Sequence, residues 1–257
     1  MSVIADYPHF LVLARRAQWD EADVDLVPDA AAWPGLDPGV RLRLERLVAG
    51  FCVGEAGVAE HLGPFGAAAQ DPDAARCFAV QESDERRHSA FFDRVARDVL
   101  AVPGATPERR RSALRPLLAP EFLELFEVRL PGMAGALARG DGNLERAVGL
   151  YHMVLEGVVF TAGQLALLDL LEGHPELPGL KDGMQRVLRD ERWHVGFGGR
   201  CLQDQGLRPE EVTDVLREGE AGALAWVDAT GGEQAEKVVA MLRRRLRTVA
   251  RAYALGS

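Results

Sequence analysis

Residues 84–88 read Asp-Glu-Arg-Arg-His and residues 190–194 read Asp-Glu-Arg-Trp-His, so nearly the same pentapeptide occurs twice in the chain. Each copy contains the pattern Glu-x-x-His. Residues three apart on an α-helix share a face, so the carboxylate and the imidazole of each copy can converge on one metal ion. One such pair is weak evidence for a metal site in a chain this rich in glutamate. The residues that precede each pair are therefore needed to support the assignment.

Each copy is preceded by a further glutamate, across a turn marked by glycine and proline. Glu55 lies 30 residues before Glu85, and Glu156 lies 35 residues before Glu191. We therefore expect each half to be a helical hairpin whose antiparallel arms bring these side chains to a similar depth. Two hairpins packed together give the ligand set of di-iron and di-manganese carboxylate proteins, with four carboxylates and two imidazoles in one bundle. The predicted metal ligands are Glu55, Glu85, His88, Glu156, Glu191 and His194.

The charges of this set favour a metal site over a group of ordinary acids. Taken singly, each glutamate is most simply a surface acid on an amphipathic helix, although Glu156 lies in a strongly apolar stretch. Four carboxylates in a bundle core would repel one another and lose their hydration, and two divalent ions would cancel their charge. Oxygen ligands with one imidazole per ion suit iron or manganese. Ligating histidines usually donate their other N–H to a carboxylate, and Asp84 and Asp190 are candidates.

The fold class follows from hydrophobic residues that recur at helical spacing almost throughout the chain, with little strand-like alternation. We predict an all-α, ferritin-like four-helix bundle with additional flanking helices, formed by residues 1–257 as a single domain. The N-terminal stretch up to Pro38 is expected to be an ordered lead-in. The predicted helices are 38–62, 73–101, 119–138, 142–172, 180–205, 209–228 and 233–253.

Composition excludes several classes of protein. The chain has 257 residues, 47% of them hydrophobic, and a formal net charge of −9, which argues against a nucleic-acid partner. Its 3 cysteines do not form a disulfide framework, and the N-terminus lacks the pattern of a secretory signal, so we expect a cytoplasmic protein. The most apolar stretch, 153–171, is interrupted by Glu156 and Asp169 and is not expected to span a membrane.

Across residues 7–205 the sequence resembles the small-subunit family of class I ribonucleotide reductases. The resemblance rests on residues 51–64, 81–95, 150–164 and 187–198. It implies a dimetal site that activates O₂ and, in the reductase proper, makes a radical for a catalytic subunit. Phe92 stands where subunits with a tyrosyl radical have Tyr, although a subgroup that stores its oxidising equivalent on the metals also has Phe. The chain ends directly after a predicted helix, so we expect no docking tail.

The closer resemblance is to ligand-binding oxidases that are similar to the reductase small subunit and hold a manganese–iron site. In that group a Val follows the first glutamate by three residues and a Tyr precedes the third carboxylate by five, and O₂ chemistry joins the two as an ether. Val58 and Tyr151 match these positions. Taken singly, either is simply a core residue. The resemblance implies manganese with Glu55, Glu85 and His88, and iron with Glu156, Glu191 and His194, or two irons.

The expected function is therefore that of an O₂-dependent dimetal-carboxylate oxidoreductase, which performs C–H oxidation beside a hydrophobic cavity. The resemblance further implies a long-chain fatty acid near the metals and a homodimer. We expect the fatty-acid tail to lie along Gly157, Val158, Ala162 and Leu165, while His152 is expected to be an ordinary core or surface histidine. The alternatives are a radical-generating reductase subunit, a related biosynthetic oxygenase, and a ferritin-like metal-binding protein without oxidase activity.

Overall fold

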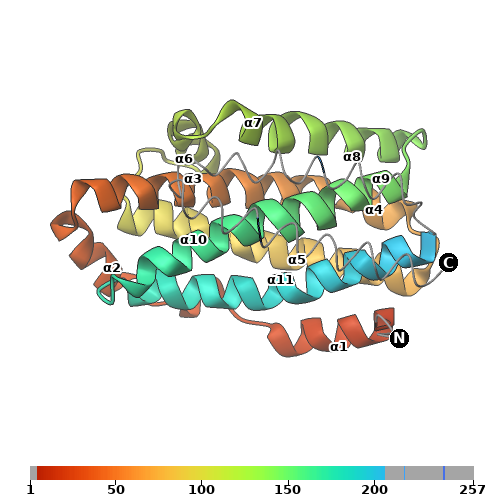
Figure 1. Ribbon diagram of the computed structural model, residues 1–257, viewed down its shortest axis with the longest axis horizontal. Helices are drawn as coiled ribbons and strands as arrows, with labels where there is room; N and C mark the ends of the chain where they lie inside the picture. Colours follow the sequence, from red (N-terminus) through yellow and green to blue (C-terminus); the bar gives the residue numbers. More distant parts are fainter. Residues whose placement is uncertain (1–4, 206–216, 218–239, 241–257) are drawn as a thin grey trace.

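Four long helical arms form an antiparallel bundle in the computed structural model (Figure 1), which describes residues 5–205 and the isolated positions 217 and 240. Three arms are the helices α3 (Pro38–His61), α5 (Pro72–Arg94) and α11 (Pro178–Gln205). The fourth arm is composite, because α9 (Leu144–Val148) continues through the π-helical segment η6 (Gly149–Phe160) into α10 (Thr161–Glu172). The predicted all-α four-helix bundle is confirmed.

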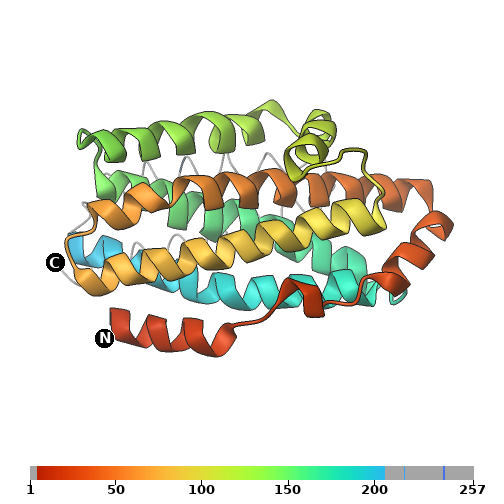
Figure 2. The same ribbon diagram turned by 180° about the vertical axis from the view of Figure 1, so that it is seen from behind.

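Shorter helices flank this bundle (Figures 1 and 2). Helix α1 (Tyr7–Ala17) packs on α5 and α11, and α8 (Leu130–Arg139) runs along α3 and α4 on the opposite side. The π-helical η5 (Glu124–Arg129) precedes α8 and packs on α3 as well. The remaining short elements are η1 (Glu21–Asp23), α2 (Val27–Ala32), η2 (Trp33–Gly35), α4 (Gly63–Ala68), η3 (Val95–Val99), α6 (Pro107–Leu114), η4 (Arg115–Leu117), α7 (Pro120–Leu123) and η5 (Glu124–Arg129).

The predicted helices 38–62 and 180–205 agree with α3 and α11 to within about two residues, which is the usual uncertainty of helix ends. The predicted helices 209–228 and 233–253 lie outside the described residues. The sequence reading missed α1, α2, α4 and α6. These helices have at most 11 residues, so their hydrophobic period is short, and packing against the bundle supplies their stability.

Aspartate and asparagine side chains fix where the long arms begin. The Asp37 carboxylate accepts from the backbone N–H groups of Gly39 and Val40, and Asp71 does the same at the start of α5. A proline follows each aspartate, where its missing N–H costs no helical hydrogen bond. Asn143 caps α9 in the same way. These caps stabilise the first turns of three of the four arms.

Among the described helices, the composite arm Leu144–Glu172 is long and apolar enough to cross a membrane by length and composition alone. In this structure, however, 78% of its most apolar window is buried inside the bundle. Its apolar character is thus explained by packing, because a helix surrounded by other helices is hydrophobic on every side.

A buried aspartate from α2 holds the first turn of α11. Asp29 Oδ2 accepts from the Gly179 N–H at 2.9 Å and Asp29 Oδ1 accepts from the Leu180 N–H at 2.7 Å. We expect Asp29→Ala to lower the free energy of unfolding by about 2 kcal/mol, since it leaves two buried N–H groups unpaired. Urea denaturation of the full chain measures this. The matched control is Asp25→Ala, whose carboxylate accepts from Val27 in an exposed position; an equal loss in both variants would contradict the assignment.

Candidate metal centre

All six predicted ligands lie side by side in the middle of the bundle. The side chains come from all four arms, and each residue is at most 2% exposed. Such complete burial of charged groups is rare in proteins unless they are paired or hold a metal ion. By element they are Glu55 on α3, Glu85 and His88 on α5, Glu156 on η6, and Glu191 and His194 on α11.

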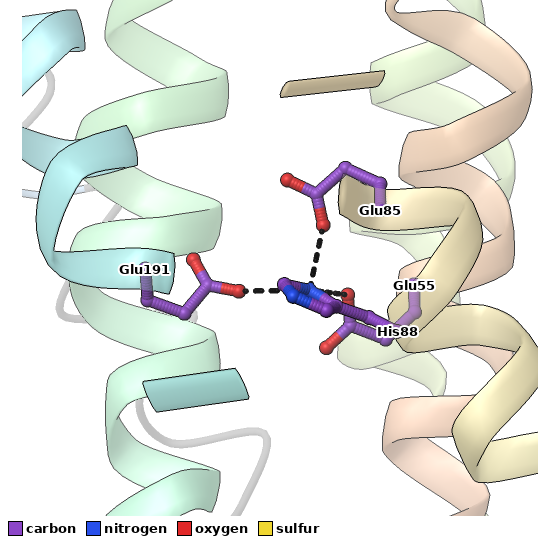
Figure 3. Close-up of side chains that lie close together, drawn as sticks. All are labelled: Glu55, Glu85, His88 and Glu191. Atoms are coloured by element: carbon purple, nitrogen blue, oxygen red, sulfur yellow. Dashed lines mark ion pairs between the residues drawn. The ribbon is translucent and has the colours of Figure 1, made fainter. Parts of the chain in front are cut away.

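These side chains form two overlapping groups, in each of which the possible ligand atoms lie within 4.8 Å of one another. The first group contains Glu55, Glu85, His88 and Glu191, which Figure 3 shows pointing toward one another from three arms. Around His88 Nδ1, Glu85 Oε2 lies at 3.3 Å, Glu191 Oε1 at 3.5 Å and Glu55 Oε2 at 3.6 Å. One cation could therefore contact all four residues.

The second group contains Glu85, Glu156, Glu191 and His194, so Glu85 and Glu191 belong to both. His194 Nδ1 lies 3.1 Å from Glu85 Oε1 and 3.3 Å from Glu191 Oε2. Each shared carboxylate thus faces His88 with one oxygen and His194 with the other. This is the arrangement required of a carboxylate that bridges two ions.

The unsatisfied atoms of the cluster fit a pair of bound cations. Within the described part of the chain, both carboxylate oxygens of Glu55 and of Glu156 lack a hydrogen-bond partner. The same is true of Glu85 Oε2, Glu191 Oε1 and His88 Nδ1. Leaving one buried polar atom unpaired costs about 1–3 kcal/mol, and a charged one costs more. Since oxygen and imidazole nitrogen are the donors that iron and manganese accept, the residues present fit these metals.

Ionisation within the cluster shows the same need for positive charge. Burial, together with the charges of Glu85 and Glu191, raises the pKa of both Glu55 and Glu156 well above the usual value. Burial alone would lower the pKa of His88 and His194, but the surrounding carboxylates outweigh it and hold both pKa values well above the usual one. Without cations, protons would neutralise the cluster. Metal ions would displace those protons, so their binding is expected to weaken at low pH.

The composite arm corrects one expectation, because residues 142–172 do not form a regular α-helix. Tyr151 and Glu156 both lie in η6, where the π-helical hydrogen bond joins residues five apart. In an α-helix these residues would point in different directions, whereas in a π-helix they share a face. The Glu156 carbonyl accepts hydrogen bonds from the backbone N–H of Thr161 and, at 2.9 Å, from the Thr161 hydroxyl. Insertions of this kind are frequent at functional sites.

Asp84 and Asp190 lie against the histidines, but in a crossed arrangement. His88 Nε2 is 3.1 Å from Asp190 Oδ2, and His194 Nε2 is 3.4 Å from Asp84 Oδ2. Each aspartate therefore holds the imidazole of the opposite pair. Burial would raise the pKa of Asp190, but the hydrogen bond from His88 and its charge outweigh burial, so this pKa lies below its usual value.

Three further residues that the sequence reading missed donate hydrogen bonds to Asp84 and Asp190. Arg87 Nη2 donates to Asp84 Oδ1 at 2.6 Å and to Asp190 Oδ2 at 3.0 Å, and so connects the two aspartates. The indole of Trp19 donates to Asp190 at 2.7 Å, and that of Trp193 donates to Asp84 at 3.2 Å. Arg87 and Trp193 occupy equivalent positions of the duplicated pentapeptide. Those equivalent positions could have indicated that both residues contact the aspartates. Trp19 lies in the supposed lead-in and carried no signal.

The structure also shows the burial and packing of the other residues that were named from the sequence. Val58 is fully buried on α3, one turn after Glu55, and Phe92 is buried and stacks on Phe51 with ring centroids 4.6 Å apart. Gly54, beside Glu55, allows Phe160 to pack closely, since a Cβ there would lie 2.5 Å from the ring. The expectation for Leu165 was wrong: Gly157, Val158 and Ala162 are buried, but Leu165 is 37% exposed and points away from the core.

Comparison with known proteins gives a family match over most of the chain. Residues 7–221 match the family model described as ribonucleotide reductase, small chain. The match contains all six carboxylate and imidazole residues of the cluster.

Several solved structures with a similar fold are named R2-like ligand-binding oxidase. A variant of R2-like ligand-binding oxidase with an anaerobically reconstituted Mn/Fe cofactor superposes with a TM-score of 0.77 and 19% identity, over 97% of this chain and 92% of that chain. A second variant, with an aerobically reconstituted Mn/Fe cofactor, gives 0.75 and 22% over 97% and 85%. A third, with a non-activated Mn/Mn cofactor, gives 0.78 and 20% over 97% and 92%. At these identities the likeness establishes a shared fold.

Proposed function

Because the chain belongs to the ribonucleotide reductase small-chain family, we propose that it is a dimetal oxidase that uses O₂ to oxidise a C–H bond. The observation that carries this proposal is the pair of overlapping ligand groups that share Glu85 and Glu191. Residues 1–257 are proposed to form one domain around that centre. The named oxidases with the same fold and a Mn/Fe cofactor support manganese and iron as the metals, with two irons as the alternative loading.

The six residues have distinct roles in this proposal. Glu55 and His88 would hold manganese at one end and Glu156 and His194 would hold iron at the other, while Glu85 and Glu191, which belong to both groups, would contact both ions. When bound, the metal pair supplies the electrons that reduce O₂ and the oxidising power for C–H cleavage. The protein fixes the ligands, and its aromatic layer of Phe51, Phe92, Phe126 and Phe160 excludes water from that side of the site.

The proposed substrate is hydrophobic, with a long-chain fatty acid as the best candidate. Support comes from the apolar, small side chains that follow Glu156, namely Gly157, Val158 and Ala162. The buried Gln164 on α10 adds a polar feature, since neither of its amide atoms has a partner among the described residues. Solvent extraction and mass spectrometry of the native protein test for the ligand. Release of no lipid would count against a bound fatty acid.

A cytoplasmic homodimer is the proposed form of the protein.

A radical-generating reductase subunit is the second candidate, since it belongs to the same family. Phe92, four residues after His88, lies buried against Phe51 and has no hydroxyl on which to store a radical. This position favours the oxidase over a subunit with a tyrosyl radical. A metal-storage bundle would use the same ligands but would load many ions per chain.

Metal quantitation and O₂ uptake separate these functions. The oxidase is expected to bind two transition-metal ions per chain after reconstitution with manganese and iron, and to consume O₂ once reduced. Storage would give many ions per chain, and a reductase subunit would restore nucleotide reduction to a partner catalytic subunit. Well under one ion per chain would reject all three.

The crossed aspartates make a separate prediction about the two ends of the centre. We expect Asp190→Ala on α11 to weaken the metal held by His88 on α5 by about 10–100-fold, the usual effect of removing a carboxylate behind a ligating histidine. Asp84→Ala is expected to do the same at the His194 end. Anomalous diffraction at the manganese and iron edges identifies which ion is lost. If each variant lost the ion beside its own pentapeptide, the crossed arrangement would be wrong.

A further inference from the structure

A chain of buried hydrogen bonds leads from His152 to the metal cluster through Tyr151. The Tyr151 hydroxyl donates to Glu85 Oε1 at 2.7 Å. Gln81 Nε2 donates to the same hydroxyl at 2.8 Å, and Gln81 Oε1 lies 3.0 Å from His152 Nε2. All four side chains are fully buried. No role was expected for Gln81 from the sequence, and His152 was expected to be an ordinary core or surface histidine.

The donors and acceptors of these four side chains fix the direction of every hydrogen bond between His152 and Glu85. Glu85, as a metal ligand, is ionised and can only accept, so the Tyr151 phenol must donate to it. The phenol oxygen then accepts from the amide nitrogen of Gln81. The Gln81 amide must therefore present its oxygen to His152, which donates through Nε2–H. The phenol proton lies on the Glu85 side and cannot turn toward Gln81.

The packing around His152 holds its ring in the position from which it donates to Gln81. Its ring lies among Phe78, Phe197 and Tyr151, with centroid distances of 5.7, 5.4 and 4.5 Å. Gly198 makes room for it, because a Cβ at that position would lie 2.1 Å from His152 Cβ. Burial, with the charge of His194, lowers the pKa of His152 to about 3. The imidazole is thus neutral at physiological pH and carries one N–H.

This series of hydrogen bonds is present in only one half of the duplicated ligand pattern. Gln81 lies four residues before Glu85, and the equivalent position before Glu191 is Val187, which is buried and apolar. Tyr151 lies five residues before Glu156, and the equivalent position before Glu55 is Gly50. Metal binding requires none of these polar residues, because both ends of the centre have the same set of ligands. Their presence at one end calls for a role connected with Tyr151.

We propose that Gln81 and His152 are positioning residues that hold the Tyr151 phenol with its proton directed at Glu85. This inference rests on the proposed oxidase function and on the expected ether between the Tyr151 oxygen and the β-carbon of Val58. That coupling forms one C–O bond and breaks one O–H and one C–H bond. Two protons and two electrons leave the side chains, and O₂ is the oxidant that takes up the electrons. The phenol proton leaves along the existing hydrogen bond to Glu85.

The test uses Gln81→Met, which keeps the side-chain volume and removes both hydrogen-bonding atoms, in a Tyr7→Phe, Tyr253→Phe background that leaves Tyr151 as the single tyrosine. The Raman doublet of tyrosine reports whether a phenol donates or accepts hydrogen bonds. We expect the doublet of Gln81→Met to shift toward that of a pure donor, and ether formation to slow by roughly tenfold. His152→Phe, which frees the Gln81 amide to rotate, is expected to produce a smaller change in the same direction.

Phe78→Leu is the matched control, since it disturbs the packing around His152 and leaves the hydrogen bonds in place. It is expected to lower the free energy of unfolding without shifting the doublet. An unchanged doublet and an unchanged ether rate in Gln81→Met would overturn the positioning role, and so would an equal shift in Phe78→Leu. A parent protein that binds no metal would reject the proposed function instead, and one that binds both metals but forms no ether would reject only the ether-forming subgroup. In either case the doublet would still decide the direction of the phenol.

Discussion

Glu191→Ala is expected to abolish the binding of both metal ions, because the Glu191 carboxylate belongs to both ligand groups. Its Oε1 faces His88 at 3.5 Å and its Oε2 faces His194 at 3.3 Å, so the substitution removes an oxygen ligand from both ends of the centre at once. The variant also leaves three buried carboxylates for two divalent ions, and the charges no longer balance. Elemental analysis after reconstitution should fall from two ions per chain to well under one, and O₂ consumption should fall with it.

Two comparison variants make this result specific to the shared carboxylate. Glu156→Ala removes a residue found in one group only, so it should lose the second ion, and with it the activity, while retaining part of the first. Glu82→Ala removes a glutamate of the same α5 helix that pairs with Arg86 near the surface, and it should retain both ions. Retention of two ions in Glu191→Ala would place the centre elsewhere in the chain.

The ligand set could be predicted from the sequence because its pattern depends on the spacing of residues within single helices and hairpins. A Glu-x-x-His pair needs only one helical turn, and the glutamates 30 and 35 residues upstream need only a hairpin. The long arms themselves were also accessible, since Asp37 and Asp71, each followed by a proline, mark helix starts by local chemistry. These features depend on residues close in sequence, and the bundle then follows from burying their apolar faces.

Features that depend on tertiary contacts could not be predicted in this way. The crossed pairing of Asp84 with His194 joins residues 110 positions apart, and nothing in the pentapeptide states which histidine an aspartate will reach. The π-helical segment η6 is similarly hidden, because its sequence is as apolar as an α-helical core segment. Its consequence is large, however. Only in the π-helical register do Tyr151 and Glu156 share the face that looks toward α5.

Gln81 illustrates an intermediate case. It lies four residues before Glu85, so helical spacing alone placed both on one face. The sequence could not show that this face meets Tyr151 from a different arm at 2.8 Å. Polar residues on the buried face beside a predicted ligand are therefore worth testing even where they match no ligand pattern.

Aerobic assembly with manganese and iron is expected to join the Tyr151 oxygen to the β-carbon of Val58 in most chains, whereas anaerobic assembly should leave both side chains unmodified. The Tyr151 hydroxyl already lies 2.7 Å from Glu85, a residue of both ligand groups, and is held there by Gln81. Val58 is one α-helical turn after Glu55 and fully buried, so it shares the face of the first group. Its tertiary C–H bond is comparatively weak, and an oxidised centre can attack only groups close to it.

Peptide mass spectrometry measures this outcome directly. The aerobic sample should contain one fused species that carries both residues and is lighter than the two separate peptides by two hydrogen atoms. Tyr151→Phe keeps the ring and removes the oxygen, so it should bind both metals and form no fused peptide. If the fully loaded, oxygen-exposed protein yields only separate peptides, the dimetal centre still stands on its six ligands. The ether-forming oxidase would then give way to a biosynthetic oxygenase or a reductase-type subunit, because both use the same centre and neither needs Val58 and Tyr151 at these positions.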